Sequence, residues 1–128
     1  MNGERWIVDA MNVIGSRADG WWHDRDAAMR EFARAVVAYA AATGKDITVV
    51  FDSDPGHAPE TPHIEDVTAR RRGPNVADHE IERLVMEDQD PTRLRVVTSD
   101  RVLVDTVTSA GARVVSSGTF RQEFDPHS

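Results

Sequence analysis

The sequence has no cysteine among its 128 residues. This absence excludes a disulfide framework, a thiol nucleophile and a cysteine-ligated zinc site, and it is typical of proteins in the reducing cytoplasm. Lysine is nearly absent as well, because Lys45 is the only lysine among the 15 basic residues. Enzyme classes that require a catalytic lysine therefore have a single candidate in this chain.

Long apolar runs are also missing. No segment approaches the roughly 20 apolar residues that a membrane span needs. The first ten residues include an acid and have no long apolar segment of the signal-peptide kind. We therefore expect a cytoplasmic protein with no membrane partner, and the length predicts one domain over residues 1–128. The formal net charge of −7 argues at first against nucleic acid as a partner.

Short apolar runs alternate along the chain with amphipathic helical patterns. This alternation predicts a three-layer α/β fold, with a mostly parallel central sheet and helices on both faces. The segment 64–70 alternates in polarity, so we expect it near an edge of the sheet. The expected strands are 5–9, 46–52, 64–70, 94–98 and 113–117, and the expected helices are 26–43, 75–88, 100–110 and 119–124.

Aspartates recur where the predicted strands end. Asp9 ends the first strand, Asp52 ends the second, and Asp100 follows the strand that ends in Val-Thr-Ser. Asp78 stands at the start of a predicted helix, after a Gly-Pro-Asn turn. In an open parallel sheet the carboxyl ends of the strands share one edge, and ligands bind in the crevice beyond it. We therefore expect these four acids to converge.

Several carboxylates in one place repel one another unless a cation neutralises them. Oxygen ligands without cysteine favour Mg²⁺ or Mn²⁺. Such clusters serve phosphoryl or phosphodiester chemistry, where the metal holds the phosphate, activates water and stabilises the leaving oxygen. The four acids also carry four of the negative charges, so the overall charge does not exclude RNA as a partner. We expect bound divalent metal to contribute to RNA binding.

Each acid also has a simpler role open to it. Asp78 and Asp100 suit the starts of helices, where acids bind free amides and favour the helix dipole. Asp52 begins a polar loop and suits a turn. This alternative is weakest for Asp9, because an acid that ends an apolar run is costly to bury unless something pairs it. The joint pattern favours a site.

Three motifs resemble the YacP-like branch of the NYN domains, a family with a PIN-like fold. Residues 7–14 are an apolar strand followed by D-x-x-N, residues 77–85 read A-D-H-E-I-E-R-L-V, and residues 96–101 read V-V-T-S-D-R. Gly111, Ala112 and Phe120 continue the match, which extends over about residues 7–124. The motifs occur in the family's order and spacing.

The resemblance implies a metal-dependent endoribonuclease that hydrolyses RNA phosphodiester bonds. It carries metal-binding roles, with Mg²⁺ or Mn²⁺, onto Asp9, Asp78 and Asp100, and less firmly onto Asp52. Asn12 matches the motif asparagine and would bind a carboxylate, a water or the substrate. Some members of the family act on ribosome-bound messages, so single-stranded RNA, messenger RNA and the ribosome are the expected partners.

Two departures from the family pattern affect the site. His79 stands where many relatives have a second acid after Asp78, and it would either weaken one metal site or bind phosphate. The chain also ends soon after Phe124, where longer relatives continue. Ser99, inside the third motif, is with His79 an accessory candidate.

A basic run precedes the Asp78 helix. Arg70, Arg71 and Arg72 are either a solvated loop or a contact to the RNA backbone, because arginine forks suit phosphate. Trp21 and Trp22, in the loop after the first motif, would stack on unpaired bases, cover the sheet edge or make a dimer contact.

Two other functions remain open from the sequence. One is a phosphatase, because Asp52-Ser53-Asp54 has the D-x-D form of aspartyl-phosphate enzymes. That motif normally follows the first strand and needs a late lysine, whereas here it follows a later strand and Lys45 precedes it. The other is a non-catalytic module that binds RNA or the ribosome through a weakened site.

Overall fold

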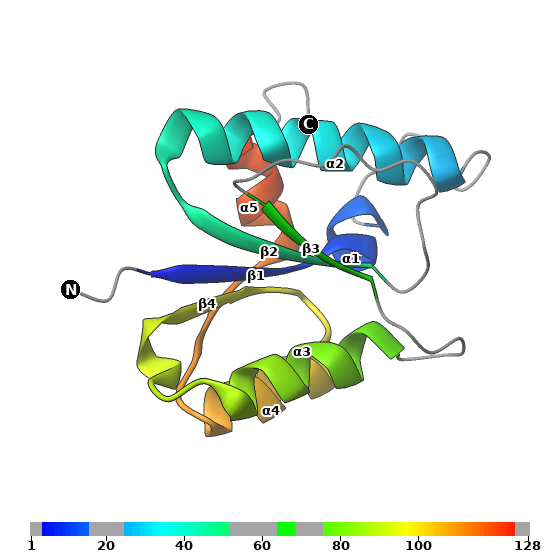
Figure 1. The fold of residues 1–128 in the computed structure, drawn as a ribbon. Coiled ribbons are helices and arrows are strands. Elements are labelled where there is room, and N and C mark those ends of the chain that lie inside the picture. Colours follow the sequence, from blue (N-terminus) through cyan, green and yellow to red (C-terminus); the bar gives the residue numbers. More distant parts are fainter. Residues whose placement is uncertain (1–3, 16–24, 52–63, 69–75, 125–128) are drawn as a thin grey trace.

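A five-stranded, fully parallel sheet forms the centre of the molecule (Figure 1). The computed structural model describes residues 4–15, 25–51, 64–68 and 76–124. The strands stand in the order β3-β2-β1-β4-β5. They are β1 (Arg5–Asp9), β2 (Asp46–Phe51), β3 (Ile64–Thr68), β4 (Leu94–Val97) and β5 (Arg113–Val115). The strand at 64–68 is thus an edge strand, as its alternating pattern predicted.

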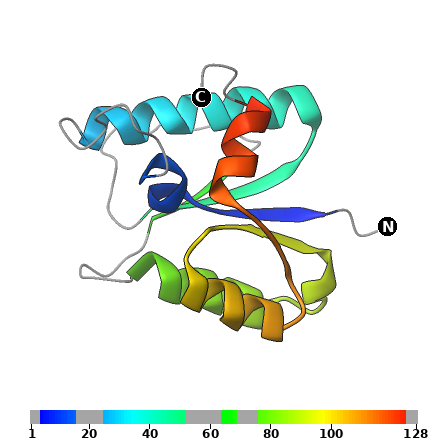
Figure 2. The same cartoon turned by 180° about the vertical axis from the view of Figure 1, so that it is seen from behind.

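Helices cover both faces of this sheet, which confirms the predicted three-layer α/β architecture (Figures 1 and 2). One face carries α1, α2 and α5, and the other carries α3 and α4. The helices are α1 (Ala10–Gly15), α2 (Arg25–Thr43), α3 (Val76–Glu87), α4 (Arg101–Ser109) and α5 (Ser117–Phe124). A 3₁₀ turn, Pro91–Arg93, leads into β4.

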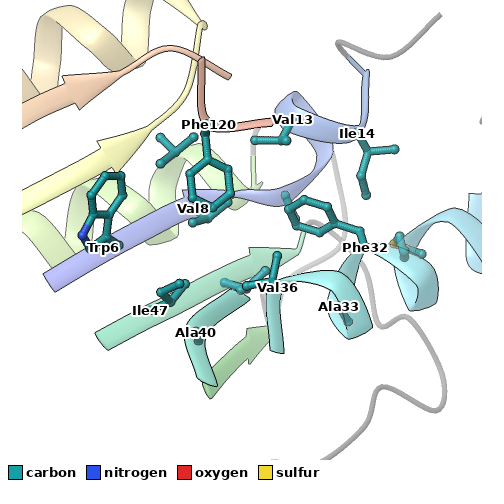
Figure 3. Packing of buried hydrophobic residues seen from close by; sticks show 14 of the residues in the cluster. Trp6, Val8, Val13, Ile14, Phe32, Ala33, Val36, Ala40, Ile47 and Phe120 are labelled. Carbon is teal, nitrogen blue, oxygen red and sulfur yellow. The ribbon is translucent and has the colours of Figure 1, made fainter. Parts of the chain in front are cut away.

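Strand β1 supplies apolar side chains to both faces, as a central parallel strand must. Trp6 and Val8 belong to the core on the α2 side, whereas Ile7 belongs to the core on the α3 side. Figure 3 shows the first of these cores, where Phe32 of α2 and Phe120 of α5 lie among the residues packed with Val8. The alternation explains why β1 reads as a continuous apolar run that ends on an acid.

Two local features differ from the sequence prediction. The chain enters α1 directly after Asp9, although no helix was expected between β1 and the following loop. Six residues are too few to display a helical period, so the pattern could not reveal it. Strand β5 ends at Val115 and not at 117, because the Ser116 hydroxyl accepts a hydrogen bond from the Thr119 amide and starts α5 there.

At the amino edge of the sheet, Asp88 lies in a cluster with two arginines. Its side chain is 4% exposed, and its carboxylate accepts from Arg93 Nη2 at 2.9 Å and Nε at 3.2 Å. Arg5 Nη1 lies 3.8 Å away, and the Asp90 amide donates at 2.8 Å. Hydrogen bonding by Arg93, helped by Asp90 and Arg5, holds the pKa of Asp88 below its ordinary value, although burial opposes this.

This lowered pKa predicts a loss of stability in acid. The Asp88 carboxylate stabilises the folded protein fully above its unfolded-state pKa, and that stabilisation disappears as the pH falls through the lowered folded-state pKa. We expect Asp88→Asn to lower the free energy of unfolding by about 1.5–3 kcal/mol at neutral pH, the range for hydrogen bonds to charged groups. In acid, below the lowered folded-state pKa, the wild type and the variant should converge, because both are then neutral at this position.

Urea unfolding of both proteins at the two pH values measures this effect. Glu87→Gln is the control, because Glu87 is exposed and pairs with Arg83 on the helix surface. Exposed pairs contribute about 0–1 kcal/mol, so this variant should change little. Equal losses for the two variants would contradict the role of Asp88.

Among the helices that the structure describes, none is long and apolar enough to cross a lipid bilayer.

Candidate active site

The order of the strands marks one place on the sheet. From β1 the chain winds outward through β2 and β3, then returns to add β4 and β5 on the other side of β1. The direction of winding therefore reverses between β1 and β4, which pair directly. Ligands of open α/β sheets bind beyond the carboxyl ends of the strands at such a switch point. The residues that follow β1 and β4 are the first to consider.

Asp9 is the last residue of β1 and is only 5% exposed. The Thr98 hydroxyl, directly after β4, donates to Asp9 Oδ2 at 3.0 Å. The same hydroxyl accepts from the Asp100 amide at 3.2 Å. Thr98 is fully buried, so this bridge is shielded from water. The structure thus brings Asp9 and the start of the Asp100 helix together at the switch point.

Asp100 is the N-cap of α4. Its Oδ1 accepts from the amides of Val102 at 3.0 Å and Leu103 at 3.1 Å. The simpler helix-start role is therefore real, but it occupies one carboxylate oxygen. Among the described residues none donates a hydrogen bond to Oδ2. A carboxylate has lone pairs on both oxygens, so Asp100 can cap the helix and still bind a cation.

Asn12, in α1, connects the carboxyl ends of three strands. Its Oδ1 accepts from the Ser99 amide at 2.8 Å and from the Ser117 hydroxyl at 2.5 Å. The Ser117 amide in turn donates to the Ser99 hydroxyl at 3.0 Å. These bonds join α1 after β1, the turn after β4, and the start of α5 after β5. The accessory candidate Ser99 thus lies in the site and contacts its neighbours through both backbone and side chain.

Several expected site residues are not part of this described network. Asp52 directly follows β2, and like Arg70, Arg71 and Arg72 it lies outside the described residues. The structure describes the backbone of Asp78 in the first turn of α3 but not its side chain. His79 is exposed on the same helix. Trp21 and Trp22 also lie outside the described residues. The predicted roles of all these residues remain predictions.

Two site residues were missed by sequence reasoning. Thr98 was read as part of a motif but given no role, and Ser117 was placed at the end of a strand. Both are fully buried polar residues at the carboxyl edge. For Thr98, a hydroxyl at the end of an apolar strand beside Asp100 was an available signal. Nothing near Ser117 in sequence indicated its partner, which lies 105 residues away.

The chemistry of the described donors fits a hard divalent cation. Asp9 and Asp100 offer carboxylate oxygens, and the sequence has no cysteine thiolate, which suits Mg²⁺ or Mn²⁺. Among the described side chains no group of three acids or histidines forms a metal site. A complete site would therefore need ligands beyond the side chains that the structure describes.

An open cavity lies at the opposite, amino edge of the sheet and has a volume of about 470 Å³. It is lined by Arg5, Leu84, Glu87, Asp88, Gln89, Asp90 and Arg93. Its arginines pair with Asp88 in the cluster described above. The cavity is separate from the acids at the carboxyl edge.

The position of the only lysine bears on the phosphatase alternative. Lys45 precedes β2, and its Nζ donates to the Tyr39 hydroxyl at 2.7 Å and lies 4.3 Å from the centre of the Trp6 ring. These contacts hold it at the amino edge, whereas Asp52 follows the carboxyl end of β2. A D-x-D phosphatase needs its lysine beside the nucleophile, so this arrangement argues against that function.

Comparisons with known proteins agree with this geometry. Residues 6–128 match the model of the YacP-like NYN domain. The crystal structure of a tryptophan-to-leucine mutant of Rae1 (YacP) from Bacillus subtilis has a TM-score of 0.76 and 23% identity, over 96% of this chain and 76% of that one. A second crystal structure of Rae1 (YacP) from Bacillus subtilis has a TM-score of 0.73 and 20% identity, over 98% of this chain and 75% of that one. These likenesses confirm the PIN-like fold. The comparison with curated proteins found no match.

Proposed function

Because the chain belongs to the YacP-like NYN domain family, a PIN-like ribonuclease family, we propose that it is a metal-dependent endoribonuclease. It hydrolyses phosphodiester bonds of RNA at the carboxyl edge of the sheet. The observation that carries this proposal is the buried bridge from Asp9 through Thr98 to Asp100. It holds Asp9, the last residue of β1, beside the backbone of Asp100, which follows β4, at the switch point where open α/β sheets bind their ligands.

Each residue of the proposed site has a distinct task. Asp9, Asp78 and Asp100, with Asp52, hold one or two Mg²⁺ or Mn²⁺ ions. When bound, the metal supplies an activated water and neutralises charge on the phosphate. Thr98 fixes the orientation of the Asp9 carboxylate by donating to Oδ2.

The substrate is RNA, in single-stranded or messenger form, and ribosome-bound messages are the class we put first. Family membership supports this choice. We assign Arg70, Arg71 and Arg72 to the flanking phosphates, because guanidinium forks bind phosphate oxygens in pairs. These arginines precede the α3 helix that carries Asp78. Such phosphate contacts position the RNA strand in the site but do not recognise its base sequence.

A cleavage assay tests the proposal. End-labelled single-stranded RNA and DNA of the same sequence are incubated with the protein in Mg²⁺, Mn²⁺ or chelator. We expect internal cuts in RNA that need metal and stop in chelator. If RNA is bound equally with and without chelator but never cut, the chain is the non-catalytic binding module. If DNA is cut as fast as RNA, the substrate assignment is wrong.

Substitutions at Asp100 separate its two roles. Asparagine caps helices as well as aspartate does, so Asp100→Asn should leave the free energy of unfolding within about 0.5 kcal/mol, whereas Asp100→Ala should lower it by about 1 kcal/mol. Both should reduce metal-dependent cleavage by about 10-fold or more, since both remove a ligand charge. Urea unfolding and the cleavage assay measure the two effects. Full activity in Asp100→Asn would leave Asp100 only its capping role.

A further inference from the structure

The side chain of Ser117 does not cap the helix that it begins. It is the first residue of α5 and is fully buried. The cap of α5 comes from Ser116, whose hydroxyl accepts from the Thr119 amide at 3.2 Å and donates to the Thr119 hydroxyl at 2.7 Å. The Ser117 hydroxyl is directed instead to Asn12 Oδ1. Capping of α5 therefore does not explain why the Ser117 hydroxyl is directed to Asn12.

The contacts of Asn12 fix which way its amide faces. A backbone amide can only donate, so the atom that the Ser99 amide meets at 2.8 Å must be the carbonyl oxygen Oδ1. That oxygen can only accept, so the Ser117 hydroxyl is the donor in the 2.5 Å bond. Both bonds hold the oxygen, and neither uses Nδ2. The donor side of the amide is thus presented away from Ser99 and Ser117.

Within the described part of the chain, the Asn12 amide is held only through its oxygen, so its Nδ2 can donate to a ligand. Two hydrogen bonds from separate elements, the turn after β4 and the start of α5, stop the amide from rotating by half a turn. Rotation would place Nδ2 against the Ser99 amide, which can only donate, so that hydrogen bond would be lost. Orienting a donor in advance lowers the cost of aligning a reacting group.

We propose that Ser117 is a positioning residue, which holds the Asn12 amide so that Nδ2 donates to a phosphate oxygen of the RNA. This inference rests on the proposed ribonuclease function. It makes the carboxyl-terminal helix a part of the site, although α5 itself contributes no acid to the proposed cluster. Ser117 acts through Asn12 and does not touch the RNA.

Ser117→Ala and Ser116→Ala form a matched pair of variants, because adjacent serines of the same helix start lose the same atom. Ser117→Ala should lower kcat about 10-fold with KM changed by less than about 2-fold, because alignment and not binding is lost. Ser116→Ala should lower the melting temperature through the lost cap but change kcat by less than about 2-fold. Equal kcat values for the two variants would overturn the proposal.

The double variant Asn12→Ala, Ser117→Ala tests whether the serine works through the asparagine. We expect it to be as slow as Asn12→Ala alone, since nothing is left for Ser117 to position. Losses that multiply would show an independent, structural effect and would overturn the proposal.

A readout without RNA separates this inference from the proposed function. The side-chain amide resonances of Asn12 should shift in Ser117→Ala and stay in place in Ser116→Ala. Unshifted resonances in Ser117→Ala overturn the positioning role even if the wild type cuts RNA. If the resonances shift but the wild type cuts no RNA, the proposed function fails and the catalytic part of this inference fails with it.

Discussion

Replacing Asp9 by asparagine is expected to reduce metal-dependent RNA cleavage by about 100-fold or more. The side chain is nearly buried at the end of the central strand, and the Thr98 hydroxyl fixes one of its oxygens. Asparagine has the same shape and still accepts from Thr98, so the fold should survive. The variant lacks the negative charge and the second ligand oxygen that a divalent cation requires.

Asp46→Asn is the matched control for this variant. Asp46 begins β2 at the amino edge, is exposed, and pairs in register with Arg5 at the start of β1. The same chemical change at the opposite end of the sheet should leave cleavage within about 2-fold, because surface charges contribute little. Melting curves should show both variants folded. Unchanged cleavage in Asp9→Asn would remove Asp9 from the site.

Phe120→Ala is expected to lower the free energy of unfolding by about 3–5 kcal/mol, the usual cost of truncating a buried phenylalanine. Phe120 is fully buried on α5, in the core shown in Figure 3. Its ring packs edge-on against the Tyr39 ring of α2, with 5.7 Å between the ring centroids. The centroid of the Trp6 ring of β1 lies 6.1 Å away. Alanine would leave a cavity where three elements meet and would loosen the helix that carries Ser117.

Met86→Ala is the control for this second prediction. Met86 is also a large apolar residue on a helix, but it is 62% exposed. Its truncation should change the free energy of unfolding by less than about 0.5 kcal/mol, as surface substitutions usually do. Chemical unfolding in urea measures both variants, and Phe120→Leu should fall between them. Similar values for Phe120→Ala and Met86→Ala would contradict the placement of α5 in the core.

The sequence predicted the fold because its strands and helices have different periods of hydrophobicity. The apolar run of β1 reads as a strand because both faces are buried, and Gly44 ends α2 with a φ of 71°, as a C-terminal glycine should. Asp9 was identifiable because an acid at the end of such a run is costly to bury unless something pairs it. The resemblance to the family motif added Asn12 to the candidate residues.

The rest of the site depends on contacts between distant parts of the chain. Asn12 and Ser117 meet across 105 residues, and no local pattern encodes that pairing. Asp100 shows a second limit of sequence-based prediction. Helix capping and metal binding both favour an aspartate at this position, so the sequence alone does not separate the two roles. Only the structure shows that the cap uses Oδ1.

Anomalous diffraction from Mn²⁺-soaked crystals tests the proposed site most directly. We predict an anomalous peak at the carboxyl edge of the sheet, bound by Asp9 and Asp100 together with Asp78 or Asp52. A soak at saturating Mn²⁺ that gives no peak there, or an ion bound elsewhere while Asp9 and Asp100 share none, would contradict the proposed metal site.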